Sequence, residues 1–235
     1  MFVYNSQYDY FESSLLKELG VTSGFGTKET PPIPDFVQSS EHYTMLQVHG
    51  TAIHDITQSS DTPNNRIENV DGLYTMRDDT LLLVKSADCI PVLYYDPTIG
   101  ALATSHQGWK GTYKNMAGTM IQHMIDAGSK AENIYVAIGA SIGDCCYGLT
   151  GERVEMFNKE YAQWFAEFSR VDGTLTYINL RKLNYLQLVD TGVLHNHIDT
   201  QLRCTHCDTN TYYSYRRGDK VAEDPSIRMW SFIMK

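Results

Sequence analysis

Apolar and polar positions along the chain divide it into a strand-rich part and a helix-rich part. Up to about residue 107, apolar residues form short runs bounded by glycine, proline or polar clusters, which is typical of β-strands. A first strand and a short helix, FESSLLKEL, are predicted before Gly20, and the alternation over 43–56 predicts a further strand or a hairpin. The clearest strands are DGLYTM (71–76), TLLLVKS (80–86), IPVLYY (90–95) and IGALATS (99–105), whereas VTSGFGT (21–27), which glycines interrupt, is predicted as a strand or a loop.

Helical spacing dominates the rest of the chain. The pattern predicts helices over 112–127, 151–168 and 180–189, with a buried strand in NIYVAIG before the second of them. Polar, proline-containing segments at 29–40 and 58–70 predict loops. Short strands close the chain at 195–200 (HNHIDT), 211–217 (TYYSYRR) and 228–234 (RMWSFIM). Strands first and helices interleaved later predict an α+β fold of mixed sheets covered by helices.

The hairpin formed by 90–95 and 99–105 carries a candidate metal site. Cys89 stands just before its first strand and His106 just after its second, so antiparallel pairing brings the two together. His49, in LQVHG, ends another short apolar run. Two histidines and one cysteine leave a tetrahedral zinc ion one open position, which is the pattern of catalytic sites. The alternative for each residue alone is a structural role, since a buried cysteine behaves as a small hydrophobe.

Four further residues have side chains suited to chemistry or to anion binding. Asp88, next to Cys89, is a candidate acid or base, or else a carboxylate that caps a turn. Lys110 lies in HQGWKG, where glycines and a helix start favour an anion, although a plain strand-to-helix turn fits as well. Arg216 and Arg217 could bind a phosphate bidentately or form a surface charge pair.

Length and charge limit the domain count and the partners. A chain of 235 residues is expected to form a single domain, 1–235. Its net charge of −9 argues against duplex nucleic acid and against an anionic membrane as partners, whereas a small anion remains compatible with a local basic cluster. The sequence shows neither a signal-peptide pattern nor an apolar run of membrane-spanning length, so a cytoplasmic location is expected.

Cysteine usage favours free thiols. The number of cysteines is odd, at five, which argues against a full disulfide framework. Cys204 and Cys207 resemble half of a zinc knuckle, but the sequence offers no second pair at that spacing. The adjacent Cys145 and Cys146 do not reproduce C-x-x-C, so reduced structural thiols are expected.

Several of these motifs together resemble the YfiH/YlmD family, long called laccase-domain or multicopper polyphenol oxidase proteins and now described as purine nucleoside phosphorylases. The matching pieces occur in family order over nearly the whole chain from about Gly20. They are QVHG (47–50), DGLYT (71–75), LLLVKSADCIPVL (81–93), SHQGWKG (105–111), IGASIGDCCYG (138–148), CDTNTYYSYRR (207–217) and RMWSFI (228–233). ADC-x-P followed by H-x-G-W-[RK]-G is highly specific as a pair.

The resemblance implies a layered α/β/β/α sandwich and a metal triad of His49, Cys89 and His106. The metal would be Zn²⁺, with Cu²⁺ as the other candidate. The implied activity is phosphorolysis of adenosine, inosine and S-methyl-5′-thioadenosine, with adenosine deamination as a second reaction, so the partners are a nucleoside and phosphate. Gln47, in QVHG, and Lys28, which stands where the family has an arginine, are implied substrate contacts.

Three other functions remain open at this stage. A copper polyphenol oxidase would need additional histidine ligands, for which His195 and His197 are the candidates in the sequence. A cysteine hydrolase would use Cys89 as nucleophile and His106 or His49 as base. A non-catalytic interaction module would carry a purely structural zinc ion. The oligomeric state is not predicted.

Overall fold

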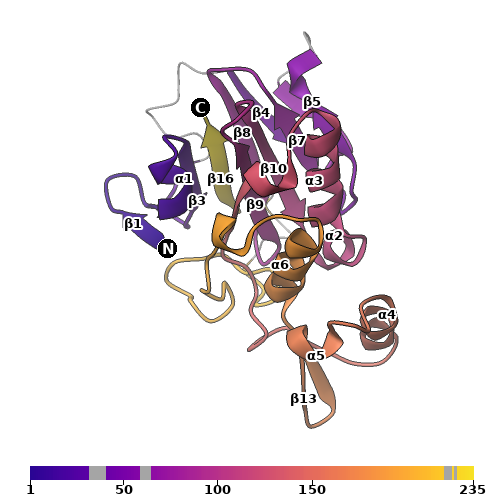
Figure 1. Cartoon of the computed structure of the whole chain (residues 1–235). Helices are drawn as coiled ribbons and strands as arrows, with labels where there is room; N and C mark the ends of the chain where they lie inside the picture. The colour runs from indigo at the N-terminus through magenta and orange to yellow at the C-terminus, as the bar shows by residue number, and fades with distance from the viewer. Residues whose placement is uncertain (32–40, 59–64, 220–223, 225–226) are drawn as a thin grey trace.

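The computed structural model describes residues 1–31, 41–58, 65–219, 224 and 227–235. Two sheets pack face to face and helices cover the outer face of one of them (Figure 1). The seven-stranded sheet has the order β1-β2-β3-β16-β8-β4-β6. Its strands are β1 (Phe2–Asn5), β2 (Tyr10–Ser13), β3 (Thr22–Gly26), β4 (Glu41–Met45), β6 (Arg66–Ile67), β8 (Thr80–Ser86) and β16 (Met229–Met234).

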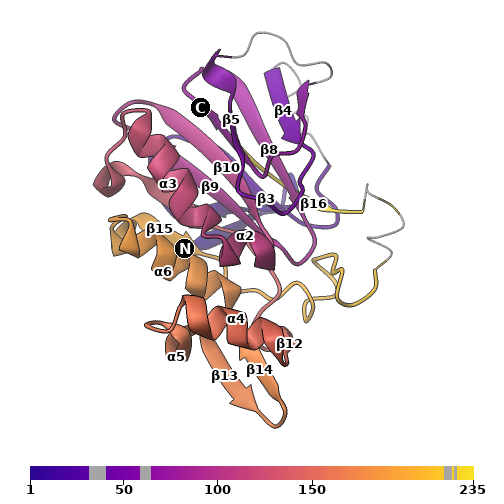
Figure 2. The same ribbon diagram turned by 90° about the vertical axis from the view of Figure 1, so that its right-hand side faces the viewer.

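The second sheet has six strands in the order β15-β11-β9-β10-β7-β5, and a third, small sheet has the order β12-β14-β13. The six strands are β5 (Ile53–Asp55), β7 (Gly72–Thr75), β9 (Ile90–Asp96), β10 (Ala101–Gln107), β11 (Tyr135–Ile138) and β15 (Ile198–Thr200). The small sheet contains β12 (Gly148–Leu149), β13 (Ser169–Asp172) and β14 (Leu175–Ile178). Figure 2 shows the β13–β14 hairpin extending away from the two large sheets.

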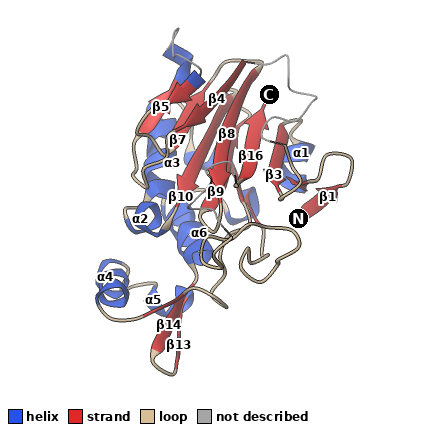
Figure 3. Cartoon of the chain, turned by 180° about the vertical axis from the view of Figure 1, so that it is seen from behind, coloured by secondary structure: helices blue, strands red, loops and turns tan. Residues whose placement is uncertain are grey.

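Six α-helices and three 3₁₀ turns complete the described part of the chain. The view from behind in Figure 3 shows α2, α3 and α6 on the far side of β9 and β10. The helices are α1 (Ser14–Glu18), α2 (Trp109–Tyr113), α3 (Met116–Asp126), α4 (Glu152–Glu160), α5 (Phe165–Phe168) and α6 (Leu180–Asp190). The 3₁₀ turns are η2 (Ile56–Gln58), η4 (Ala131–Asn133) and η5 (His195–His197). None of the described helices combines the length and apolar character needed to cross a bilayer.

The continuous apolar runs of the sequence belong to strands that are buried on both faces, as expected for the interior of a layered fold. In β9, Leu93 contributes to the core between the two sheets, whereas Val92 and Tyr94 pack under the helices. In β8, Leu82 faces the inter-sheet core and Leu83 the opposite face. The predicted layered fold of mixed sheets and helices is therefore confirmed.

Two predicted helices are each interrupted. The segment 112–127 divides into α2 and α3 at Asn115, whose φ of 59° is left-handed and whose side chain accepts a hydrogen bond from Gly118 N at 3.0 Å. Asparagine tolerates this conformation and caps helices, so it ends one helix and starts the next. The segment 151–168 divides into α4 and α5 at Tyr161, whose hydroxyl donates to Tyr113 O at 2.8 Å.

Other boundaries differ as well. The segment 43–56 is neither one strand nor a hairpin, because β4 and β5 belong to different sheets. Residues 211–217 do not form the predicted strand, since side chains take the backbone donors that a strand ladder would use: Ser214 N donates to Asp219, and Arg216 N to Asp88. Within 195–200 only Ile198–Thr200 is a strand.

Parts of the predicted loops cannot be compared with the structure, and the first helix is shorter than predicted. Residues 32–40 and 59–64 of the two predicted loops lie outside the described part of the chain, and β6 occupies part of the second. The first helix is confirmed in a shorter form, since only its second half, α1, is helical. The β13–β14 hairpin was not predicted.

Candidate active site

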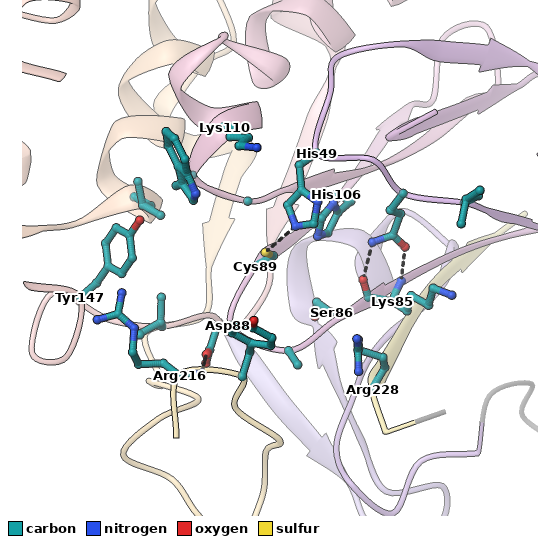
Figure 4. Close-up of a pocket in the computed structure, with 18 of the residues that line it drawn as sticks. His49, Lys85, Ser86, Asp88, Cys89, His106, Lys110, Tyr147, Arg216 and Arg228 are labelled. Atoms are coloured by element: carbon teal, nitrogen blue, oxygen red, sulfur yellow. Dashed lines mark hydrogen bonds between the residues drawn. The ribbon is translucent and has the colours of Figure 1, made fainter. Parts of the chain in front are cut away.

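The two histidines and the cysteine that the sequence singles out converge where β9 begins and β10 ends (Figure 4). Below, the sheet edge means this edge, which is formed by strand ends in the middle of the six-stranded sheet. In the β9–β10 hairpin His106 pairs with Pro91 and Gln107 with Ile90, which places His106 beside Cys89 as predicted. Cys89 Sγ lies 3.9 Å from His49 Nε2, and the two imidazole rings have centroids 4.8 Å apart. One ligand atom from each residue lies within 4.8 Å of the others.

A buried carboxylate, Asp71, holds the side chain of His106 and the backbone of His49 at once. Its Oδ1 accepts a hydrogen bond from His106 Nδ1 at 2.8 Å, which leaves His106 Nε2 as the nitrogen available to a metal. The same carboxylate accepts from the backbone N–H groups of Val48, His49 and Gly50, at 3.1, 3.0 and 2.6 Å. These bonds hold His49 at a φ of 61°, a left-handed conformation that is rare for a residue with a side chain.

Neighbouring charges and hydrogen bonds shift the pKa values of Cys89, His106 and Asp71. Burial alone would raise the pKa of Cys89, but the positive charge and hydrogen bond of His106, with help from His49, lower it to about 6. Burial alone would lower the pKa of His106, but the Cys89 thiolate and Asp71 raise it to about 9. For Asp71, hydrogen bonds from His106 and Gly50 outweigh burial and lower its pKa. The thiolate, which is the metal-binding form of cysteine, is therefore favoured.

The three side chains line a pocket of about 620 Å³ that is rich in cations and aromatic rings. Its cations come from five residues: Lys85, Lys110, Arg153, Arg216 and Arg228. Burial and the positive charges of Arg66 and Arg228 lower the pKa of Lys85, as expected in an electropositive cleft. Its aromatic rings are those of Trp109, which is half-buried, Tyr147, which is buried, and Tyr215, which is exposed. Although the chain is acidic overall, this pocket favours anions.

Four of the predicted contact residues lie in this pocket: Gln47, Asp88, Lys110 and Arg216. The Gln47 side-chain amide pairs with the backbone of Lys85 through bonds of 2.7 and 3.1 Å, so it connects the His49 segment to β8. Lys110 Nζ lies 5.8 Å from the ring centroid of Trp109. The Arg216 guanidinium lies 5.2 Å from the ring centroid of Tyr147, and Figure 4 shows the two side by side.

The Asp88 carboxylate is held by three donors from the segment 205–216. Thr205 Oγ1 donates to one oxygen at 2.6 Å, and Ser214 Oγ and Arg216 N donate to the other at 3.0 and 2.7 Å. Asp88 thus anchors the loop that carries Arg216 (Figure 4). Its predicted acid–base role stays a prediction.

Lys28 and Arg217 do not line the pocket. Lys28 Nζ donates to Thr209 O at 2.8 Å and lies 5.1 Å from the Tyr213 ring centroid. Arg217 pairs with Asp219 and donates to the carbonyl oxygens of residues 205, 206 and 212. Both side chains therefore brace the loop that holds Arg216, and the structure does not bring them to the other predicted contacts.

Sequence reasoning gave no role to Asp71, Arg153 or Arg228. Asp71 was visible only as the first residue of DGLYT, where aspartate before glycine is typical of an ordinary turn. Arg153 and Arg228 reach the pocket from segments far apart in the chain, and no local sequence pattern connects them.

The donor set suits a metal ion that does chemistry. Two imidazoles and a thiolate are ligands that zinc and copper accept. The Asp71 carboxylate on His106 Nδ1 is the usual support of a metal-binding histidine. Three protein ligands at the wall of a pocket leave a position for water or substrate.

Comparisons with known proteins find one family model and relatives that are named for different activities. The model of the family described as multi-copper polyphenol oxidoreductase laccase matches residues 35–235. Purine nucleoside phosphorylase YlmD of Geobacillus stearothermophilus is 34% identical over 200 residues, which cover 80% of this chain and 69% of that protein. Adenosine deaminase RL5, from an unknown prokaryotic organism, is 32% identical over 152 residues, covering 64% of this chain and 58% of RL5.

Solved structures extend this likeness to the whole fold. The crystal structure of YlmD from Geobacillus stearothermophilus superposes with a TM-score of 0.84 at 26% identity, covering 100% of this chain and 98% of that one. The crystal structure of the Bacillus licheniformis hypothetical protein YfiH gives 0.83, also at 26% identity, with coverage of 100% and 99%.

Proposed function

We propose that this chain, which belongs to the multi-copper polyphenol oxidoreductase laccase family, is a metal-dependent purine nucleoside phosphorylase. Its substrates would be adenosine, inosine and S-methyl-5′-thioadenosine, each with phosphate. The supporting observation is that a three-ligand metal group and five cationic side chains share one pocket. The similarity to YlmD, which is named a purine nucleoside phosphorylase, points the same way.

His49, Cys89 and His106 would hold the metal, for which zinc is the first candidate and copper the second. When bound there, zinc supplies a Lewis acid with one position left for a ligand. Asp71 keeps the His106 ring in place and holds the backbone of the His49 segment. These hydrogen bonds would keep the triad close to the arrangement that an ion requires.

The cations would bind phosphate. In phosphorolysis a phosphate oxygen forms a bond to C1′ of the pentose while the bond from C1′ to the purine nitrogen breaks, and the purine leaves with a proton. Arg216 and Lys110, both in the pocket, would hold the anion by charge-assisted hydrogen bonds. The remaining cations raise the local potential and so the concentration of phosphate at the site.

The aromatic side chains would receive the purine. Trp109 and Tyr147 both line the pocket, and a flat base gains stacking and dispersion energy on such rings. Each of these rings already has an arginine beside it, Arg153 at 4.2 Å from the Trp109 centroid and Arg216 at 5.2 Å from that of Tyr147. The proposed base and phosphate sites would therefore be neighbours, as the reaction requires. Asp88 is the candidate for transferring the proton.

The experiment is to incubate the protein with inosine or adenosine, with and without phosphate, and to measure free base and pentose 1-phosphate. We expect base release that needs phosphate, is lost after chelation, and returns with zinc. The Cys89→Ala variant should be inactive under all conditions. Release of free base without phosphate, or full activity of metal-free Cys89→Ala, would overturn the proposal.

Deamination of adenosine is the second candidate, and the similarity to adenosine deaminase RL5 favours it. Water replaces the amino group at C6, so inosine and ammonia form without phosphate. The same incubations distinguish the two reactions by their products. Ammonia without free base would identify deamination as the main activity.

The other candidate functions have less support in the geometry. His195 and His197, which a multicopper site would need, lie on η5, where they contact Tyr185 and Tyr135 and do not line the pocket. A cysteine hydrolase would remain sensitive to alkylation of Cys89 and active without metal. A non-catalytic module would bind metal and turn over no nucleoside. Each outcome can be read from the same set of samples.

A further inference from the structure

The four cysteines outside the triad come together in a second group. Cys145 and Cys146 lie in the turn between β11 and β12, and Cys204 and Cys207 lie after β15, about sixty residues further along the chain. Their four sulfur atoms all lie within 4.8 Å of one another. In the sequence the pairs are Cys-Cys and Cys-Thr-His-Cys, and only the second has the spacing of a zinc knuckle.

The sulfur separations suit a shared ion. Cys207 Sγ lies 3.6 Å from Cys145 Sγ and 3.3 Å from Cys146 Sγ. Four thiolates about 2.3 Å from one tetrahedral zinc ion lie roughly 3.8 Å from each other. A disulfide would require a separation of about 2.05 Å, and all four cysteines have free thiols here.

The backbone around the group is built to hold it. Gly143 N donates to Cys204 Sγ at 3.2 Å, a bond that supports a thiolate ligand. A parallel bridge pairs Ser141 with Cys204, and Thr205 N donates to Ser141 O at 3.1 Å. A side chain at Gly143 would place its Cβ 3.2 Å from Cys204 Cβ, so glycine lets the two segments approach. The thiols are thus positioned by contacts between the two segments that carry them.

A buried cation lies beside the group. The Arg181 side chain, whose residue is 6% exposed, donates to the carbonyl oxygens of Leu202 and Arg203, just before Cys204. Its Nη2 would also lie 3.4 Å from a Cβ added at Gly143. A zinc ion with four thiolates carries a net charge of about −2, about half of which a neighbouring guanidinium offsets.

We propose that Cys145, Cys146, Cys204 and Cys207 bind a zinc ion in a closed, four-thiolate site separate from the triad. Four protein ligands leave no position for water, so this zinc is structural. It fastens the turn that ends at Tyr147 to the segment that contains Thr205. Since Thr205 donates to Asp88 and Tyr147 lines the pocket beside Arg216, the ion stabilises one wall of the pocket.

The test uses a background in which the triad is broken. Cys89→Ala protein, purified without chelator and supplied with zinc, should retain about one zinc ion per chain by elemental analysis, whether or not the wild type has activity. Cys204→Ser and Cys207→Ser in the same background should retain none. When the triad is intact, the single variant Cys204→Ser should lose the zinc ion of the four-cysteine group and keep the ion at the triad.

Two measurements protect the test against misfolded variants. Cobalt added to metal-depleted Cys89→Ala should give the strong near-ultraviolet charge-transfer absorption of several thiolates on one ion, and zinc should abolish it. In that protein all four thiols should react with a thiol reagent after metal removal, and none rapidly after zinc is restored. Circular dichroism and the melting temperature establish that each variant is folded.

Three results would overturn the proposal. One is a Cys89→Ala protein that takes up no zinc although its four thiols are reduced. Another is a disulfide among these cysteines, found by mass spectrometry in freshly purified protein that contains no cluster metal. The third is unchanged zinc content in a folded Cys204→Ser, Cys207→Ser double variant. None of these results depends on catalysis, so failure here is distinguishable from failure of the phosphorylase proposal.

Discussion

The two walls of the pocket are held in different ways. The wall that carries His49, Cys89 and His106 is the edge of the six-stranded sheet, where strand pairing and the Asp71 carboxylate fix each residue. The facing wall carries Tyr147 and Arg216, on segments without regular strands or long helices. Asp88, Arg217 and the group of four cysteines hold that wall together.

The difference matches the proposed task of each wall. A metal ion tolerates errors of only a few tenths of an ångström in the positions of its ligands, which suits residues fixed by strand pairing and by the Asp71 carboxylate. A phosphate and a purine vary in position from one substrate to the next, which suits side chains on loops that polar anchors restrain. We expect changes at the sheet-edge wall to alter metal binding, and changes at the loop wall to alter substrate binding while the metal stays in place.

Asp71→Asn tests the sheet-edge wall and should have the largest effect. The amide keeps the shape but replaces one acceptor oxygen with a donor, which then faces the N–H groups of residues 48–50 or the His106 ring. We expect metal affinity to fall about 10- to 100-fold and stability to fall by about 1–3 kcal/mol. Competition with a chelating dye measures the first and thermal unfolding the second.

Asp96→Asn is the matched control. Asp96 is also fully buried, at the opposite end of β9, and accepts from Thr98 N at 2.8 Å. The Asp96→Asn variant should have a lower melting temperature and an unchanged affinity for the metal. If both variants weakened metal binding equally, general loosening of the hairpin would explain the effect and Asp71 would have no special role.

Gly108→Ala should have the next largest effect. It removes no hydrogen bond and would act only by steric contact with His49 and Cys89. The added Cβ would lie 2.7 Å from Cδ2 of His49 and 3.0 Å from Cys89 Sγ, so these side chains must move. The backbone φ of −73° is ordinary, and alanine introduces no backbone strain. We expect metal binding about tenfold weaker, at a stability cost of about 1–3 kcal/mol.

Gly111→Ala provides the comparison within the same motif. Its Cβ would lie 3.4 Å from Gly50 O and 3.6 Å or more from other atoms, and its position is helical. Alanine is favoured over glycine in helices, so stability should not fall. Equal metal loss in both variants would show that the motif, and not the contact at Gly108, is responsible.

The sequence predicted the sheet-edge wall well because its geometry is largely local. Cys89 and His106 belong to one hairpin, and the strand register alone brings them together. The position of His49 depended on Asp71, whose three backbone contacts cannot be read from a DG dipeptide. Resemblance to a family supplied the third ligand where local reasoning could only suggest it.

The loop wall was predicted poorly for a physical reason. Thr205 and Arg216 reach Asp88 across more than a hundred residues, and the cysteine pairs meet across about sixty. The segment 211–217 has the alternation of a strand, but carboxylates accept its backbone N–H groups and prevent the ladder. Helical spacing continued through Asn115 because the apolar face of α3 gives no sign of a left-handed break.

Asp88→Asn tests the loop wall and separates two roles for this residue. As an anchor, Asp88 holds the Arg216 backbone and the Ser214 hydroxyl, and the neutral amide would weaken bonds that now involve a charge. We then expect KM for phosphate to rise about three- to tenfold, equivalent to about 1 kcal/mol, with metal content unchanged. As an acid or base, Asp88 would instead be needed for kcat, and the variant would also alter the pH profile of kcat.

Asp208→Asn is the control in the same loop, because Asp208 accepts from Thr211 N and pairs with Arg203 but does not touch Arg216. An equal rise in KM in both variants would mean that any disturbance of the loop has this effect, and the division of labour between the two walls would then not rest on Asp88.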